Sequence, residues 1–321
     1  MARLEVVPFS DGHLDDAGRL LAARHAGQRE AEPALPARFE SPVAARAEVE
    51  QAWRAEGASG AAAIRDGRVV GYLVGAPLEA RIWGENVWVD LAGHAVEEPE
   101  DLRDLYAAAA ERWVEAGRTR HYALVPAGDA ALVEAWFRVG FGQQHAHGLQ
   151  EVAPRELVLP DGVEIRAPRA DEVEELIDVD LSLPAHQGRS PVFSDIGLPS
   201  REDSREEWAK TLAGEEEEVL VAYRNGKPLA VWSVTPLEVS KVHKGLGRPE
   251  RAAFLGFAAT LPEARGGGLG LALTDASLNW AARHGYEVMM TDWRVTNLLS
   301  SRFWPRRGFR PVFLRLYRSI P

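Results

Sequence analysis

Hydrophobic positions in the last third of the chain change their spacing twice, and each change marks a different predicted element. Residues 254–259 form an apolar run with the length of a buried strand. From residue 269 onward apolar side chains follow helical spacing up to a basic turn and Gly285, which is an ordinary C-terminal stop for a helix. The apolar face of this predicted helix consists of Leu269, Leu273, Ala276 and Trp280.

A second apolar run at 287–292 predicts the next strand. Thr296-Asn297 then opens a short predicted helix that leads into Phe303-Trp304 and, shortly after, Gly308-Phe309. The predicted order is therefore strand, loop, long helix, strand and short helix.

Two segments recur along the chain and indicate an internal repeat. Arg65-Asp66-Gly67-Arg68 returns 159 residues later as Arg224-Asn225-Gly226-Lys227, and both predict a β-hairpin with a two-residue turn. Trp136 to Phe141 returns 168 residues later as Trp304 to Phe309. We predict two copies of one fold, with a first domain at 1–155 and a second at 156–321.

The two offsets differ by nine residues, which places an insertion in the second copy at about 239–251. Two interpretations are open: a loop over an acceptor site, or a plain solvated hairpin. The polar residues of this segment include Lys241, His243, Lys244 and Arg248.

Composition narrows the function classes. The chain has 321 residues, 46% apolar residues and no cysteine, so disulfides, thiolate metal sites and a thiol nucleophile are excluded. No apolar run approaches the length of a membrane span, and the first residues lack a signal-peptide core, so we expect a cytoplasmic protein with no membrane partner. A net charge of −11 argues against a nucleic-acid partner and favours a neutral or cationic one. The sequence does not indicate an oligomeric state.

We expect no metal site either. His145 and His147 occupy alternate positions of a predicted strand, without a third ligand in the sequence pattern.

The loop between the first strand and the long helix carries the most specific chemistry. Pro262 to Gly270 is almost free of side chains, with glycines at 266, 267, 268 and 270. Such a loop at a helix N-terminus lets backbone N–H groups approach a pyrophosphate. The nucleotide-triphosphate loop is excluded because Leu271-Ala272 follows in place of Lys-Ser/Thr, and the dinucleotide fingerprint has a different final spacing. A glycine-rich surface loop without a ligand is the remaining alternative.

The pattern Arg-x-x-Gly-x-Gly, formed by Arg265, Gly268 and Gly270, resembles the coenzyme A loop of the GNAT superfamily of N-acetyltransferases. The second signature is Asn297, a short helix and an aromatic residue before Gly308-Phe309, which is similar to the later signature of that family. The resemblance covers residues 163–321. It implies an α/β fold (α+β mixed sheet) in two tandem GNAT-like acyl-CoA N-acyltransferase domains, with acetyl-CoA as co-substrate.

The first copy lacks this loop. Its counterparts of Arg265, Gly266, Gly267, Gly268 and Gly270 are Glu97, Glu98, Pro99, Glu100 and Leu102, whose carboxylates and bulk exclude an anion. We therefore expect a degenerate domain that supports the second one.

The resemblance also assigns cofactor-binding residues in the second copy. Backbone groups on a strand made to diverge by a bulge hold the pantetheine, the loop holds the pyrophosphate, and Arg265 closes the loop. Asn297 contacts the cofactor, caps the short helix, or does both. The implied residues are Ala258, Ala259, Thr260, Arg265, Gly266, Gly267, Gly268, Leu269, Gly270, Leu271, Asn297 and Phe303.

The expected reaction is acetyl transfer to the amine of a small molecule. Asp292, at the end of a buried strand, is the first candidate for the general base, with a capping role as the alternative, and Glu238 is the second candidate. Relatives carry Tyr as the thiolate acid where this chain has Trp304, and an indole N–H is not an acid near neutral pH. Two rivals therefore stay open: a non-catalytic acyl-CoA sensor or scaffold, and a partner-binding protein without coenzyme A affinity.

Overall fold

The computed structural model describes residues 3–79, 81–194, 197–214, 216–240 and 242–321. These residues divide into two compact units. The first comprises the described residues of Met1–Ala146, together with Lys244–Glu250 and Pro311–Pro321, and the second comprises those of His147–His243 and Arg251–Arg310. The predicted boundary after residue 155 separates the two repeats along the sequence, whereas these two units are defined by contacts in space. The boundary therefore stays a prediction.

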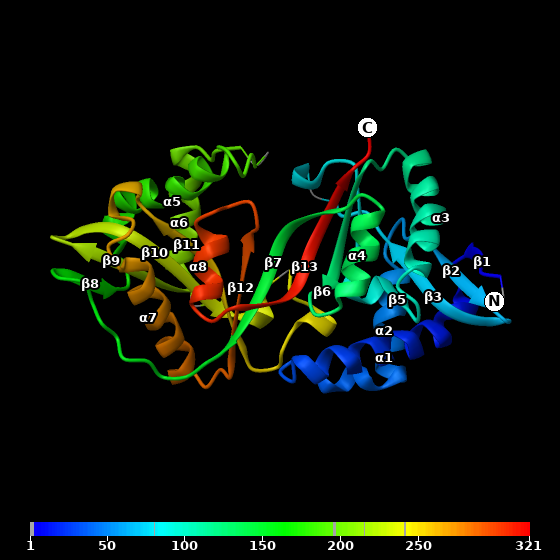
Figure 1. The fold of residues 1–321 in the computed structure, drawn as a ribbon. Coiled ribbons are helices and arrows are strands. Elements are labelled where there is room, and N and C mark those ends of the chain that lie inside the picture. Colours follow the sequence, from blue (N-terminus) through cyan, green and yellow to red (C-terminus); the bar gives the residue numbers. More distant parts are fainter. Residues whose placement is uncertain (1–2, 80, 195–196, 215, 241) are drawn as a thin grey trace. The chain divides into compact units, whose positions relative to one another are not determined.

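The first unit contains a four-stranded sheet in the order β1-β2-β3-β5. Gly71 on β3 lies close to Leu105 of α3, whereas the side chain of its neighbour Tyr72 packs against Phe9. Successive residues of β3 therefore face opposite sides of the sheet. Helices α1 and α2 cover one side of these strands and α3 the other (Figure 1). The elements up to α3 are β1 (Glu5–Pro8), α1 (Leu14–Ala31), α2 (Pro42–Trp53), β2 (Ser59–Arg65), β3 (Arg68–Gly75), β4 (Asn86–Val89), β5 (His94–Val96) and α3 (Asp101–Glu115).

Strand β6 lies outside that four-stranded sheet. It pairs in parallel with β4 and antiparallel with the last strand of the chain, β13, through residues such as Val125 and Leu314. The remaining elements up to the second unit are β6 (Arg120–Pro126), α4 (Ala130–Arg138) and β7 (Gly142–Glu151), and β13 spans Arg310–Ser319.

The second unit repeats the order of the first. Its strands run β12-β11-β10-β9-β8, with β7 beside β12. Helices α5 and α6 lie on one side of β8 to β11, and α7 lies on the other (Figure 1). The elements are β8 (Val163–Arg166), α5 (Val173–Gln187), α6 (Arg201–Ala213), β9 (Glu218–Arg224), β10 (Lys227–Pro236), β11 (Ala252–Thr260), α7 (Leu269–Arg283), β12 (Val288–Arg294) and α8 (Ser300–Arg306).

The predicted repeat is confirmed at its two most specific points. Both hairpins turn through two residues with positive φ, at 53° and 73° for Asp66-Gly67 and at 54° and 76° for Asn225-Gly226. These angles define the type I′ turn that Asp-Gly and Asn-Gly favour. Likewise the Trp and Phe of each recurring segment are buried and meet edge to face, with ring centroids 4.7 Å apart in the first copy and 5.4 Å apart in the second. The mixed α/β architecture is therefore as predicted.

The interpretation of the insertion as a solvated hairpin is wrong. The described part of the segment forms two short 3-10 turns, Leu237–Val239 and Gly245–Gly247, and its residues on either side of position 241 form no hairpin. His243 and Leu246 are only 4% and 2% exposed. Lys244–Glu250 belongs to the first unit, where Gly247 packs closely against Leu91. Lys241 lies outside the described residues.

A buried histidine gives the first unit a predictable pH dependence. His94 is fully buried, its Nε2 lies 2.9 Å from the Leu124 carbonyl, and burial lowers its pKa to about 3. The unfolded chain binds this proton near pH 6.5, so stability is lost as pH falls from that value toward 3. We expect His94 to reduce the free energy of unfolding by about 2 kcal/mol between pH 7.5 and pH 5.

Urea unfolding at the two pH values measures this effect. His94→Gln keeps a side-chain donor for the Leu124 carbonyl but removes the titration, so its loss of stability on acidification should be smaller. An equal loss in both proteins would contradict the assignment to His94.

Candidate functional site

The strand before the glycine-rich loop contains a bulge at the predicted place. Ser233 on β10 pairs with Phe257 and Val234 pairs with Leu255, which leaves Gly256 as an extra residue on β11. Parallel pairing with β12 runs from Ala252 to the pair Leu255 and Thr291, and the described ladder stops there. Beyond the bulge β11 and β12 therefore separate, although both strands continue.

The separated part of β11 holds three of the predicted binding residues. Ala258, Ala259 and Thr260 still pair with β10, at Trp232, Val231 and Ala230 respectively. Their other edge faces the gap that opens toward β12. The backbone N–H and C=O groups at such an edge can form hydrogen bonds with an extended ligand, in the way that they would pair with an added strand.

The loop after β11 is exposed and open. Gly266 and Gly268 have φ values of +79° and +83°, which favour glycine over any residue with a Cβ atom. A Cβ at Gly266 would meet nothing within 4 Å, and one at Gly267 would meet only the Ala264 carbonyl, at 3.4 Å. Arg265 Nε donates to the Thr260 carbonyl at 3.3 Å, so this side chain ties the loop back to the strand end.

The first turn of α7 points unused donors at this loop. The first helical hydrogen bond runs from Ala272 N–H to the Gly268 carbonyl, at 3.1 Å. Among the described residues the N–H groups of Leu269, Gly270 and Leu271 therefore have no helical acceptor. Together with the positive end of the helix dipole, these donors suit an anionic group.

Gly270 has a different role from the other loop glycines. A Cβ there would lie 3.2 Å from the Phe303 ring and 3.7 Å from Trp232. The residue is glycine because an aromatic side chain of α8 packs directly on the helix backbone. Phe303 is thus held beside the loop, while Leu269 is buried and Leu271 is 43% exposed.

Asn297 is buried and lies three residues before the start of α8, and its main-chain carbonyl accepts the Ser301 N–H at 2.9 Å. Its Oδ1 accepts the Leu299 N–H at 3.1 Å and lies 3.2 Å from His186 Nε2. Asn297 therefore makes the two hydrogen bonds of an N-cap residue, one through its side chain and one through its carbonyl, although α8 itself begins at Ser300. Residues at the end of α5 thus contact the segment after β12, and Gln187 Oε1 also accepts from Arg294 Nε, at 3.2 Å. His186 has no sequence signal of its own.

Asp292 is half-buried on β12, one residue beyond the last pair with β11. Burial lowers the pKa of His243 to about 4, and the negative charge of Asp292 opposes that shift. His243 Nε2 lies 3.2 Å from His147 Nδ1, and its Nδ1 lies 3.0 Å from Ser240 Oγ. The carboxylate therefore stands at the strand split, beside a buried pair of imidazoles that sequence spacing did not connect.

Glu238 does not meet Asp292 at the loop. It is exposed in the turn after β10, and its charge helps to raise the pKa of Tyr286, which precedes β12. Pro236 pairs with Ala253, seven residues before Thr260, so Glu238 lies about 20 Å along the strands from the loop. Because Ala253 also pairs with Met289, Asp292 lies only three residues, or about 10 Å, further along the strands than Pro236. Asp292 is the nearer of the two predicted base candidates to the loop.

Trp304 is only 4% exposed and packs in an aromatic cluster. Its ring lies 4.9 Å from Phe303, 5.4 Å from Phe309 and 6.4 Å from Trp232, each measured between centroids. These contacts identify it as a core residue that positions α8 against β10.

In the first copy the backbone N–H groups at the start of the long helix donate to nearby carbonyls, whereas those at the start of α7 have no helical acceptor. Before α3, Asp101, Leu102 and Arg103 donate to the carbonyls of Glu98, Pro99 and Glu100, at 3.0, 3.2 and 3.1 Å. This segment therefore has no cradle of free donors, and the degeneracy of the first copy stays a prediction.

The described residues contain no group of three or more histidine, cysteine or acidic side chains arranged to hold a metal ion. They also contain no helix with the length and apolarity needed to cross a membrane.

Comparison with known proteins places the site in a family. Residues 184–309 match the model of the acetyltransferase (GNAT) family. The solved structure of a GCN5-related N-acetyltransferase from Sphaerobacter thermophilus covers 98% of this chain and 95% of its own, with 13% identity and a TM-score of 0.60. No curated protein sequence matches the chain.

Two further solved structures align with nearly the whole chain. A glucosamine N-acetyltransferase region of a fungal multi-domain β-N-acetylglucosaminidase has 17% identity and a TM-score of 0.54, over 99% of this chain and 38% of its own. A tandem GNAT protein from the clavulanic acid biosynthesis pathway has 19% identity and a TM-score of 0.48, over 99% and 98%. Residues 184–309 therefore match the GNAT acetyltransferase family, and the chain as a whole shares the fold of a solved GCN5-related N-acetyltransferase.

Proposed function

We propose that the second copy is an acetyl-CoA-dependent N-acetyltransferase that transfers an acetyl group directly to the amine of a small molecule, within a ternary complex. Residues 156–321 form the acetyltransferase domain in this proposal, and residues 1–155 form the degenerate copy. One observation carries it: an open glycine loop with unused helix donors lies directly after the point where β11 leaves β12.

The residues present fit acetyl-CoA. Amides from Gly266 to Leu271 would hold the pyrophosphate, because the loop offers donors without Cβ atoms in the way. Ala258, Ala259 and Thr260 would hold the pantetheine arm along the free edge of β11. Asn297 and Phe303 border the same space from the other side of the loop.

When bound, acetyl-CoA supplies an activated acyl group as a thioester. Asp292 accepts the proton of the incoming ammonium, so that the amine lone pair can form the new C–N bond while the C–S bond breaks. The proton on Asp292 passes to water, and water provides the proton for the departing thiolate. Trp304 takes no part in proton transfer because its indole N–H is not acidic near neutral pH.

The negative net charge supports a cationic or neutral acceptor. His186, at the end of α5, borders the space beside Asn297 where such an acceptor would enter.

A non-catalytic acyl-CoA sensor is the second candidate. It is favoured by the burial of Trp304 in an aromatic cluster, at the position where relatives carry the acidic Tyr. The sensor would bind acetyl-CoA tightly without releasing coenzyme A in the presence of any amine.

A single pair of measurements separates the candidates. Calorimetry should give one acetyl-CoA site per chain, and mass spectrometry of a broad panel of small amines should reveal an acetylated product. Tight binding without product across the panel would favour the sensor, and absence of binding would reject both.

We expect Trp304→Tyr to fold and to keep or raise the acetylation rate. The smaller ring still fills most of the aromatic cluster, and its hydroxyl restores a proton donor at the place where relatives use one. The rate on an identified acceptor measures this, with Trp304→Phe as the control that repacks the site without a hydroxyl. A gain shared by both variants would assign the effect to packing.

A further inference from the structure

The chain between β7 and β8 runs alongside α7, the helix that follows the glycine loop (Figure 1). Arg155 is fixed to the later half of that helix, because its N–H donates to Asn279 Oδ1 at 2.8 Å and its carbonyl accepts from Asn279 Nδ2 at 3.0 Å. Pro160 reaches the other end, since a Cβ at Gly268 would lie 3.3 Å from Pro160 Cγ. Gly268 and Asn279 are about 16 Å apart along the helix axis, which the joining segment, residues 155–160, spans in a largely extended form.

Two sides of α7 are covered near the loop, and the strip between them is open. Phe303 packs on Gly270 from one side, and the joining segment contacts Gly268 and Asn279 on the other. Successive residues of a helix are rotated by about 100°, so Leu271 lies between these two sides. It is apolar and yet 43% exposed. A cofactor with its pyrophosphate on the loop therefore has an apolar surface beside it for its nucleoside.

Two arginines flank this strip, one from each side. Arg155 Nε lies 3.9 Å from Asp275 Oδ1, and its Nη2 donates to Gln150 Oε1 at 3.2 Å. Arg307 directly follows α8, and its guanidinium carbon lies 5.7 Å from the centre of the Phe303 ring. Among the described residues, Arg307 Nε is buried without a hydrogen-bond partner, and no carboxylate forms an ion pair with this side chain.

One carboxylate of α7 lies near both arginines. Burial raises the pKa of Asp275, and the positive charges of Arg155 and Arg307 oppose that shift. The neighbouring residues Glu156 and Arg306 are both exposed and have opposite charges. Two guanidinium groups therefore act on one carboxylate, which leaves a positive charge in excess. A phosphate monoester carries almost two negative charges at neutral pH and pairs well with guanidinium groups.

Coenzyme A carries such a phosphate one nucleoside away from its pyrophosphate. Asp275 lies about 7 Å beyond Gly270 along α7, and helical side chains lean toward the N-terminus, which is the direction of the loop. We propose that Arg155 and Arg307 bind the 3′-phosphate of coenzyme A, with the joining segment as one wall of the nucleoside site. This inference rests on the function proposed for the second copy, and it makes the junction between the copies part of the cofactor site.

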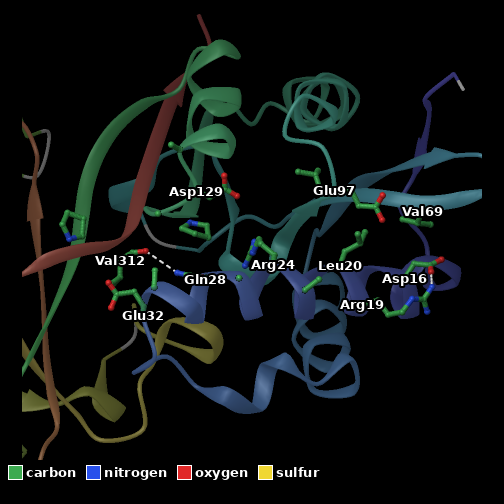
Figure 2. A pocket seen from close by; sticks show the side chains of 18 of the residues that line it. Asp16, Arg19, Leu20, Arg24, Gln28, Glu32, Val69, Glu97, Asp129 and Val312 are labelled. Atoms are coloured by element: carbon green, nitrogen blue, oxygen red, sulfur yellow. Dashed lines mark hydrogen bonds and ion pairs between the residues drawn. The ribbon is translucent and has the colours of Figure 1, made fainter. Parts of the chain in front are cut away.

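The first unit contains the alternative place for such a group, a cavity of about 640 Å³. Leu20, Arg24 and Gln28 of α1 lie along one side of it, and Glu97 and Asp129 lie on the opposite side (Figure 2). The arginines that line the cavity already have carboxylates or backbone carbonyls as partners. We therefore expect no part of the cofactor there.

Calorimetry with acetyl-CoA and acetyl-3′-dephospho-CoA, in phosphate-free buffer, tests the proposal. The wild-type chain should bind acetyl-CoA about tenfold or more tightly than the dephospho ligand, because only acetyl-CoA offers the phosphate to the two guanidinium groups. Arg155→Gln and Arg307→Gln should each bring the ratio of the two affinities toward one. The affinity for the dephospho ligand should be unchanged in both variants, which also shows that they are folded.

Two control variants should keep the wild-type ratio. Arg306→Gln removes an exposed positive charge next to Arg307, and Ala23→Trp fills the first-unit cavity from an exposed residue of its lining. Equal affinity of the wild type for both ligands, a wild-type ratio in either Arg155→Gln or Arg307→Gln, or an equal loss in a control would overturn the proposal and leave acetyl-CoA binding intact. Failure of the wild type to bind either ligand would overturn the proposed function as well.

Discussion

Replacing Gly268 with Glu, its counterpart in the first copy, should weaken acetyl-CoA binding about a hundredfold or more. Gly268 has a φ of +83° and immediately precedes the first turn of α7, whose N–H groups have no helical acceptor. A carboxylate there would stand in the space of the pyrophosphate and repel it. Calorimetry gives both the affinity and the number of sites, which should be one per chain.

Strain at Gly268 has to be separated from charge, because any side chain there is unfavourable at positive φ. Gly267 offers the control, since its φ is not in that region and a Cβ would meet only the Ala264 carbonyl at 3.4 Å. Gly267→Glu should lose much more affinity than Gly267→Gln. Two equivalent sites, or unaltered affinity in Gly268→Glu, would refute the one-site proposal.

Asp292→Asn should lower kcat/KM on an identified acceptor by about a hundredfold or more, the usual contribution of a positioned general base. Acetyl-CoA affinity should change little, because Asp292 lies on β12 and not on the loop. The loss should shrink as pH rises, since more of the acceptor then arrives as neutral amine. Initial rates across a pH series measure both effects.

Glu238→Gln is the matched control for this variant. It removes an exposed carboxylate that lies about 20 Å along the strands from the loop, so its kcat/KM should equal that of the wild type. Wild-type activity in Asp292→Asn would move the base elsewhere, and His186 beside Asn297 would be the next residue to test.

Local signals explain why so much of the site could be predicted from sequence. Gly266 and Gly268 mark an open loop because glycine adopts positive φ readily, and Gly267 between them adds no side chain. The paired turns at Asp66-Gly67 and Asn225-Gly226 are equally local, since the two residues themselves determine the type I′ geometry. An internal repeat then extends each local prediction to the other copy.

The features missed by sequence depend on contacts between distant residues. Gly270 has the same sequence signature as its neighbours, but its role comes from the Phe303 ring, which packs there from α8. The pairing of His147 with His243 joins residues 96 positions apart. The interpretation of the insertion as a solvated hairpin was also wrong because of distant contacts. Its polar composition does not reveal that His243 and Leu246 are buried.

The pairing of β13 with β6 has a consequence for biosynthesis. Arg120 to Pro126 is synthesised long before its antiparallel neighbour, Phe313 to Ser319. Until then one edge of β6 presents unpaired N–H and C=O groups, which can recruit a strand from another nascent chain. The first copy is therefore completed only after the second has been synthesised, and a fragment of residues 1–155 would keep this edge open permanently.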